Sequence, residues 1–246
     1  MATSTRSRWR VPTLLILLSV IPVAAGAVRV AQLTGGARIT PGNARFFADP
    51  LPVLVHIPTA SLYCVLGPLQ FVPAFRRRLP AWHRVVGRLL VACGLAAGLA
   101  GLWMTLFYPL APGDVEMLRG FRVVFGSAMV ACLVLGIVTI RRRDIAGHRA
   151  WMIRAYAIAQ GAGTQAVLGM LWLLFIGSPA EGLGKALLLT AGWLINIALA
   201  EWIVRRPAFR IRSGRSGKAV RNVEDMAGGS DQPARFAISD GVSGRL

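Results

Sequence analysis

Long runs of apolar residues alternate with short polar segments along most of this chain. Six of these runs approach or exceed the ~18 to 20 residues that a helix needs to cross the hydrocarbon core of a bilayer. They predict an all-α fold, a polytopic membrane helix bundle with six transmembrane helices in one domain, residues 11–204. The predicted spans are residues 11–28, 52–75, 85–109, 123–140, 151–176 and 187–204.

Basic residues are distributed unevenly between the segments that connect these spans. All but six of the 28 Lys and Arg residues lie in the N-terminal segment, the second and fourth connections with the helix starts that follow them, and the tail. By the positive-inside rule, both termini are therefore predicted to be cytoplasmic. The remaining six are Arg29, Arg38, Arg45, Arg119, Arg122 and Lys185.

The net charge changes the expected partners. A formal net charge of +18 would suggest nucleic-acid binding in a soluble protein. Here, basic loops facing the lipid bilayer and its anionic headgroups account for the charge, so no nucleic acid is expected. A membrane-protein partner or a homo-oligomer is left open.

The two ends of the chain lie outside the predicted bundle. Residues 1–10 are predicted to be a cytoplasmic N-terminus, although residues 1–27 also fit a cleavable signal peptide. The apolar stretch at residues 11–28 is longer than a usual signal core, which favours a retained first span. Residues 205–246 are rich in Gly, Ser and Arg and poor in apolar residues, which predicts a disordered, basic cytoplasmic tail.

Two similar sequences precede two of the spans. The string RRRLPAWHR at residues 76–84 aligns without gaps with RRRDIAGHR at residues 141–149, which predicts an internal parallel repeat of two helical hairpins. Pro80 suits the first position of a helix, and Asp144 suits an N-cap. His83 and His148 are then each expected at the fourth residue of their helices.

These two histidines are candidate ligands of one haem b. The positive end of the helix dipole favours neutral imidazoles there, as iron ligation requires, and Arg84 and Arg149 are available for the propionates. In the alternative interpretation, all four residues are interfacial anchors and no cofactor is bound. No metal site is predicted, because no CxxC pair joins the three cysteines, Cys64, Cys93 and Cys132.

Polar residues at membrane depth are candidate functional groups by default. Glu201 is the only acidic residue within a predicted span, and it is expected to pair with Arg88 or Arg154. Such a pair can hold helices together or belong to a path for protons or substrate. The other polar candidates are His56, Gln70, Gln160, Gln165 and Asn196.

Several motifs carry a resemblance to a known family. They are His56, GPLQF at residues 67–71, PAWHRVVGR at 80–88, HRAWMIRAYA at 148–157 and WLINIALAEW at 193–202. From about His56 to Trp202, the chain resembles the domain-of-unknown-function 2306 family of bacterial predicted multi-pass membrane proteins. The resemblance implies a bacterial plasma (inner) membrane fold without a settled activity. Thr164 and Gln165 depart from the family pattern, where a basic residue is expected.

The sequence thus predicts an integral plasma-membrane protein of uncharacterised activity, structural or accessory, with a basic lipid-facing inner surface. One alternative is a single-haem b electron-transfer protein ligated by His83 and His148. Another is a small-molecule or proton-coupled transporter. No P-loop, HExxH, GxSxG or EF-hand motif occurs, so no enzyme class is predicted.

Overall fold

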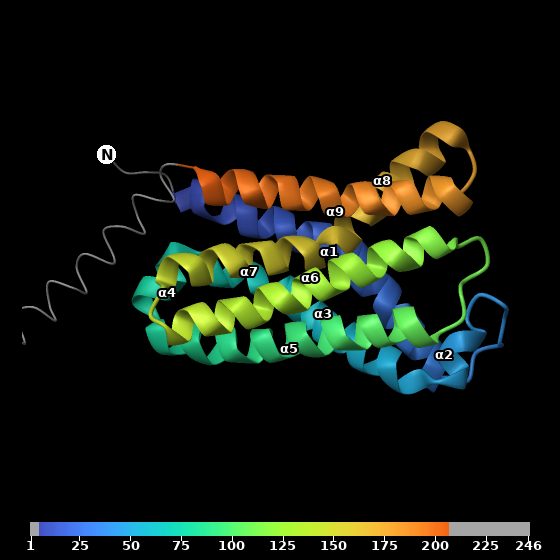
Figure 1. The fold of residues 1–246 in the computed structure, drawn as a ribbon, viewed down its shortest axis with the longest axis horizontal. Helices are drawn as coiled ribbons and strands as arrows, with labels where there is room; N and C mark the ends of the chain where they lie inside the picture. The colour runs from blue at the N-terminus through green and yellow to red at the C-terminus, as the bar shows by residue number, and fades with distance from the viewer. Residues whose placement is uncertain (1–4, 207–246) are drawn as a thin grey trace, which may run out of the picture. The chain divides into compact units, whose positions relative to one another are not determined.

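The computed structural model describes residues 5–206, with side chains from residue 9 onward, and this part is helical with no strand (Figure 1). Within it, six segments are long and apolar enough to span a membrane, which confirms the predicted all-α bundle. Most of the predicted tail, residues 207–246, lies outside the described residues. The helices are α1 (Thr5–Thr34), α2 (Ala44–Ala48), α3 (Pro50–Gln70), α4 (Pro73–Arg78), α5 (Pro80–Phe107), α6 (Glu116–Arg141), α7 (Ile145–Ala159), α8 (Gly161–Ile176) and α9 (Gly182–Arg205).

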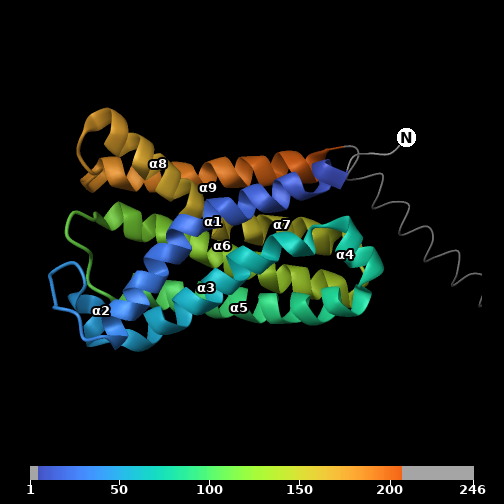
Figure 2. The same cartoon turned by 180° about the vertical axis from the view of Figure 1, so that it is seen from behind.

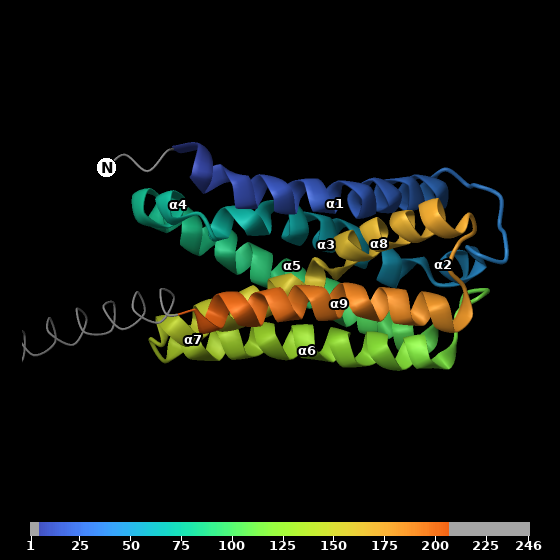
Figure 3. The same cartoon turned by 90° about the horizontal axis from the view of Figure 1, so that it is seen from above.

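The bundle formed by these helices has two distinct ends. Helix α1 begins and α9 ends at the end that carries α4, whereas α2 lies at the opposite end (Figures 1 and 2). We call these the α4 end and the α2 end. Helix α1 packs against α3 and α8, on the other side of the bundle from α6 (Figure 3).

Proline determines where the second span ends. Helix α3 stops at Gln70, five residues before the predicted end of that span. Val72 is extended (φ −73°, ψ 116°) because it precedes Pro73, whose ring disfavours a helical conformation in the residue before it. Pro73 then begins the short helix α4, so residues 52–75 are not one continuous helix.

The fifth predicted span also contains a break. Helix α7 ends at Ala159 and α8 begins at Gly161, and α8 leaves the direction of α7 (Figure 1). At the break, the Gly163 amide donates to the carbonyl of Gln160 at 3.1 Å instead of to the carbonyl of Ala159. The predicted single helix over residues 151–176 is thus interrupted near its middle.

Neighbouring helices stabilise this break. Asn196 of α9 donates through Nδ2 to the Ala157 carbonyl at 3.2 Å and accepts from the Thr164 hydroxyl at 2.9 Å. Backbone groups freed from a helix inside a bilayer must find such partners, since no water is available to them. Asn196 therefore binds a backbone carbonyl before the break and a side chain after it.

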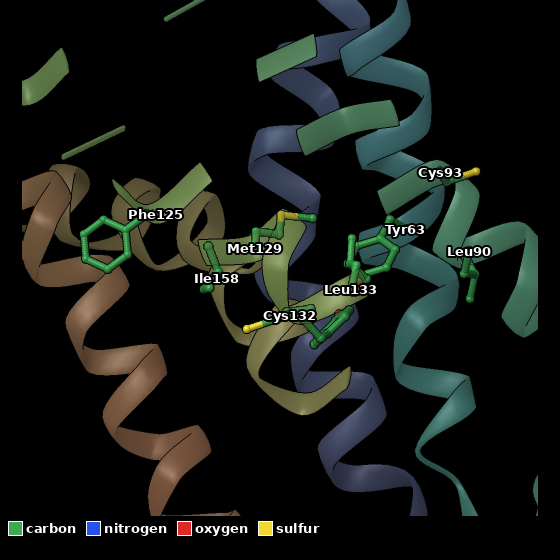
Figure 4. Packing of buried hydrophobic residues seen from close by; sticks show 10 residues of the cluster. Tyr63, Leu90, Cys93, Phe125, Met129, Cys132, Leu133 and Ile158 are labelled. Atoms are coloured by element: carbon green, nitrogen blue, oxygen red, sulfur yellow. The ribbon is translucent and has the colours of Figure 1, made fainter. Parts of the chain in front are cut away.

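The core lies between α3, α5, α6 and α7 (Figure 4). Its helices approach closely at glycines, as is usual where lipid supplies no hydrophobic driving force. A Cβ at Gly94 would lie 2.9 Å from the Tyr63 ring and 3.0 Å from Leu133. Phe125 stacks on Trp193 of α9, with ring centroids 4.7 Å apart, so the core reaches α9.

The two helix starts predicted from the repeated strings are confirmed. Pro80 is the first residue of α5, and Asp144 Oδ1 accepts from the Gly147 amide at 2.8 Å as the N-cap of α7. His83 and His148 are consequently the fourth residues of their helices. The segments before them differ, because the helix α4 precedes only α5. The parallel repeat of the two hairpins stays a prediction.

Candidate functional site

A cavity of about 490 Å³ lies among the helices in the half of the bundle nearer the α2 end. Its size is in the range of ~300–1,000 Å³ that small-molecule sites occupy. It follows α5 from Ala97 to Tyr108, a length of about 16 Å at ~1.5 Å per residue. The walls come from α1, α3, α5, α6, α9 and the α7–α8 break, and are mainly apolar.

Three arginines line the cavity at the α2 end: Arg45 of α2, and Arg119 and Arg122 of α6. The Arg45 and Arg29 guanidinium carbons each lie 4.7 Å from the centre of the Phe46 ring. Burial lowers the pKa of Arg45, and repulsion from Arg122 and Arg29 adds to this, while the charge of Asp114 acts in the opposite direction. Arginine nevertheless stays protonated at neutral pH, so this end of the cavity is cationic.

Asp114 is the buried counter-ion of Arg122 and Lys185. Its side chain is only 1% exposed, and it lies 3.0 Å from Arg122 Nη1 and 2.7 Å from Lys185 Nζ. Burial alone would raise its pKa, but the hydrogen bond from Lys185 and the charges of Arg122 and Lys185 outweigh burial and lower it. Asp114 is thus a charged carboxylate that links the α5–α6 connection to α6 and α9.

The same connection borders the cavity. Pro109, Leu110 and Ala111 line it, and the Gly182 amide donates to the Gly113 carbonyl at 2.9 Å. The connection is therefore fixed at both α6 and α9, directly beside the arginines.

His56 of α3 also lines the cavity. Its Nδ1 is 2.8 Å from the carbonyl oxygen of Ala97. Gly101 makes this approach possible, since a Cβ there would lie 3.3 Å from His56 Cε1. Thr105, one turn beyond Gly101, also lines the cavity, so polar groups of α3 and α5 meet in its wall.

The α7–α8 break forms the inner limit of the cavity, where Ile158 to Gln160 contribute to the lining. Gln160 is 3% exposed and donates through Nε2 to the Leu15 carbonyl at 2.6 Å and to Ser19 Oγ at 3.1 Å. Both partners belong to α1. Gln160, a candidate from the sequence, therefore joins α1 to the break.

The remaining intramembrane candidates lie elsewhere. Arg154 pairs with Glu201 through two hydrogen bonds, as expected, whereas Arg88 is exposed and takes no part in that pair. This ion pair lies toward the α4 end, away from the cavity. Arg154, Glu201, Arg88 and Asn196 thus hold no position in the cavity wall.

His83 and His148 both lie at the α4 end, at the starts of α5 and α7. His148 Nδ1 lies 2.8 Å from the Gly136 carbonyl oxygen. His83 Nδ1 and the Gln70 amide are buried without a hydrogen-bond partner among the described residues. Arg84 is exposed and Arg149 is half-buried. Within residues 5–206, no group of three or more His, Cys, Asp or Glu is arranged to hold a metal.

The cationic end of the cavity was not expected from the sequence. Arg45, Arg119 and Arg122 belong to the six basic residues that the charge distribution assigns to the less basic side. The available signal was the position of Arg119 and Arg122 close after Asp114, an acid and two bases beside the start of one span. Their meeting with Arg45 depends on the fold.

Comparison with known proteins gives one match. Residues 53–204 match the family model described as predicted membrane protein (DUF2306). No curated protein and no solved structure matches the chain. The match covers α3 to α9 and so includes most of the cavity wall.

Proposed function

Since the chain belongs to the DUF2306 family of predicted membrane proteins, we propose a function that operates within the bilayer, as a carrier of amphipathic organic anions. The observation that carries this proposal is the cavity with Arg45, Arg119 and Arg122 at one end and largely apolar walls beyond them. Such a cavity is complementary to a molecule with an anionic group at one end and an apolar body.

Arginine is well suited to hold the anionic group. Its planar guanidinium donates paired hydrogen bonds to carboxylate or phosphate oxygens, and charge-assisted bonds are about twice as strong as neutral ones. Arg122 is already bonded to Asp114 at 3.0 Å, and Arg119 lies 3.5 Å from the exposed Glu116. Arg45 and Arg119 are therefore the best placed to receive a ligand anion.

The break between α7 and α8 favours transport over static binding. Many secondary transporters place their substrate near the bilayer midplane against helices that are interrupted there. Here, the interruption at Gln160 lies midway along the Ile145–Ile176 segment and borders the inner limit of the cavity. Side-chain hydrogen bonds already satisfy backbone groups at this break. The angle between α7 and α8 can therefore change without exposing new backbone groups to lipid.

Orientation follows from the basic residues. Under the positive-inside rule, the α4 end, with Arg76 to Arg78 and Arg141 to Arg143, faces the cytoplasm of a bacterial plasma membrane. The cavity then lies nearer the non-cytoplasmic side, and the anion enters from that side. Exposed arginines of the α4 end, such as Arg77, Arg78 and Arg142, contact anionic lipid headgroups.

Binding of a fluorescent fatty acid, dansyl-undecanoic acid, to the protein in lipid nanodiscs tests this function. We expect saturable binding that weakens about tenfold or more when Arg45 and Arg119 are replaced by Gln, as expected for lost charge-assisted hydrogen bonds. Arg38→Gln is the matched control, since Arg38 is an exposed arginine outside the cavity lining. Binding that is not saturable, or that Arg38→Gln weakens equally, would contradict the proposal. The structural or accessory role predicted from the sequence would then be favoured.

A second candidate function is the predicted single-haem b protein. The supporting observation is that His83 Nδ1 has no partner among the described residues, while His148 Nδ1 is held by the Gly136 carbonyl. A backbone carbonyl on one ring nitrogen is the usual way to orient a ligating histidine. Protein expressed with ample haem would show a Soret band that His83→Ala or His148→Ala abolishes. A colourless wild-type protein would rule this candidate out.

A further inference from the structure

Three polar side chains of the cavity wall, His56, Thr105 and Gln165, present acceptors, while its arginine end presents donors. These acceptors specify the ligand more closely. We infer that the anion carries a hydrogen-bond donor, a hydroxyl or an amide N–H, on its apolar body, and that this donor binds between His56 and Thr105. The inference rests on the proposed carrier function and names the substrate class of the same cavity.

The hydrogen bond of His56 determines which of its nitrogens can accept. Nδ1 lies 2.8 Å from the Ala97 carbonyl, and because a carbonyl only accepts, Nδ1 must carry the proton. A charged imidazolium at this depth would be costly to bury, so the ring is neutral. Nε2 is then an unprotonated acceptor in a residue that lines the cavity.

Thr105 is limited in the same way. Its hydroxyl donates to the Gly101 carbonyl at 2.8 Å, which leaves the oxygen lone pairs as its remaining capacity. Gly101 also lies against the His56 ring, 3.3 Å from Cε1 at the position of an added Cβ. The two acceptors are therefore neighbours across one glycine.

Gln165 extends the pattern toward the break. Its Nε2 donates to the Leu189 carbonyl at 2.8 Å, so the nitrogen must face that carbonyl and Oε1 is left to accept. His56, Thr105 and Gln165 thus each donate to a backbone carbonyl and keep an acceptor. A bound apolar chain alone would displace water from these acceptors and leave them unpaired, at a cost that a donor on the ligand removes.

The distance between the two polar parts of the ligand follows from α3. His56 lies six residues after Pro50, where α3 begins at the α2 end, which is about 9 Å at ~1.5 Å per residue. With the charged group held at the α2 end, the ligand class is an amphipathic anion with a hydroxyl or amide on its apolar body, up to about 9 Å from that group. Mid-chain hydroxylated fatty acids have this arrangement.

A matched pair of fatty acids tests this inference. Octadecanoic acid and the same acid with a hydroxyl at the middle of the chain are each titrated against the full-length protein in nanodiscs, by displacement of the dansyl ligand. We expect the hydroxylated acid to bind about fivefold more tightly, as expected for one additional hydrogen bond. His56→Phe, which keeps a ring but removes the acceptor, should bring the two affinities together.

Two further variants make the test specific. Thr105→Val keeps the shape and removes the hydroxyl, so it should also reduce the preference, and it carries the test if His56→Phe fails to fold. His148→Phe removes an equivalent histidine–carbonyl bond at the α4 end and should leave the preference unchanged. Equal affinity of the two acids for the wild type would overturn the inference while the carrier function stands. If neither acid binds, both are overturned.

Discussion

Arg154 of α7 holds the carboxylate of Glu201 of α9 with two of its nitrogens, Nε donating to Oε1 and Nη2 donating to Oε2 at 3.1 Å. Both side chains are about one quarter exposed, at 25% and 27%. Arg205 adds a third hydrogen bond to Oε2 at 3.2 Å. The α7 part of the fifth span is therefore fixed to α9 at the α4 end.

Removing Arg154 should destabilise the bundle. Arg154→Ala leaves the partly buried Glu201 carboxylate with Arg205 alone, and we expect a loss of about 1–3 kcal/mol. Thermal unfolding of the detergent-solubilised protein, followed by circular dichroism, measures the change. Arg205→Ala is the control: Arg205 is 76% exposed, so its loss should cost less than about 1 kcal/mol. Equal losses of stability in the two variants would show that the bidentate pair with Arg154 contributes no more than the exposed Arg205.

This ion pair was predictable, because it depends only on depth. One acidic residue in the spans, at the level of two arginines, has to find a cation in a medium that penalises isolated charge. The sequence does not show which arginine pairs with Glu201, because that depends on the direction in which each side chain points from its helix. Helix starts at Pro80 and Asp144 were predictable for a similar reason, as both follow from local backbone chemistry.

The cavity was not predictable. Its arginines come from α2 and α6, and no local pattern brings distant segments together. The break at Gln160 was missed because hydropathy stays high across it. A polar residue followed by Gly161 and Gly163 in the middle of a span was the available signal, since sharp kinks away from proline often occur at such sequences.

Acidification should release the α5–α6 connection. The pKa of Asp114 is lowered, so its stabilising contribution is complete above the ordinary carboxyl pKa of about 3.9 and is lost as the pH falls below that value through the lowered pKa. Asp114→Asn should be less stable than the wild type by roughly 1–3 kcal/mol at neutral pH. This difference should persist to about pH 5 and shrink below about pH 4.

Unfolding temperatures of both proteins across this pH range check the prediction. Glu116→Gln serves as the control, because Glu116 is 70% exposed and its removal should have little effect at any pH. A stability difference between the wild type and Asp114→Asn that does not depend on pH would contradict the role of the charged carboxylate.

A side chain at Gly163 should separate α1 from the break. A Cβ there would lie 2.4 Å from the carbonyl oxygen of Leu18, so backbone must move to accept Gly163→Ala. Overpacking of this kind costs about 1–3 kcal/mol. At Gly169, on the same helix, an added Cβ has nothing within 4 Å. Gly169→Ala should therefore be tolerated, and a ranking of unfolding temperatures in the opposite order would refute the close packing.

Reporter fusions test the orientation on which entry from the non-cytoplasmic side depends. Fusions after Arg78 and Arg143, both at the α4 end, should report a cytoplasmic location. Fusions near Arg38, Asp114 and Glu181 should report the opposite side. A fusion after Arg143 that reports the non-cytoplasmic side would invert the orientation and place the cavity nearer the cytoplasm.

Photolabelling in nanodiscs tests most directly whether the cavity binds an amphipathic anion. Octadecanoic acid with a diazirine at mid-chain is cross-linked to the protein, and the labelled residues are located by mass spectrometry. We expect labels among the cavity-lining residues of α3, α5 and the α7–α8 break, such as Ile57, Leu102 and Ile158, and their loss on Arg45→Gln with Arg119→Gln. Labels confined to lipid-facing side chains such as Leu89, Leu174 and Phe175, unchanged in that variant, would contradict a ligand site in the cavity.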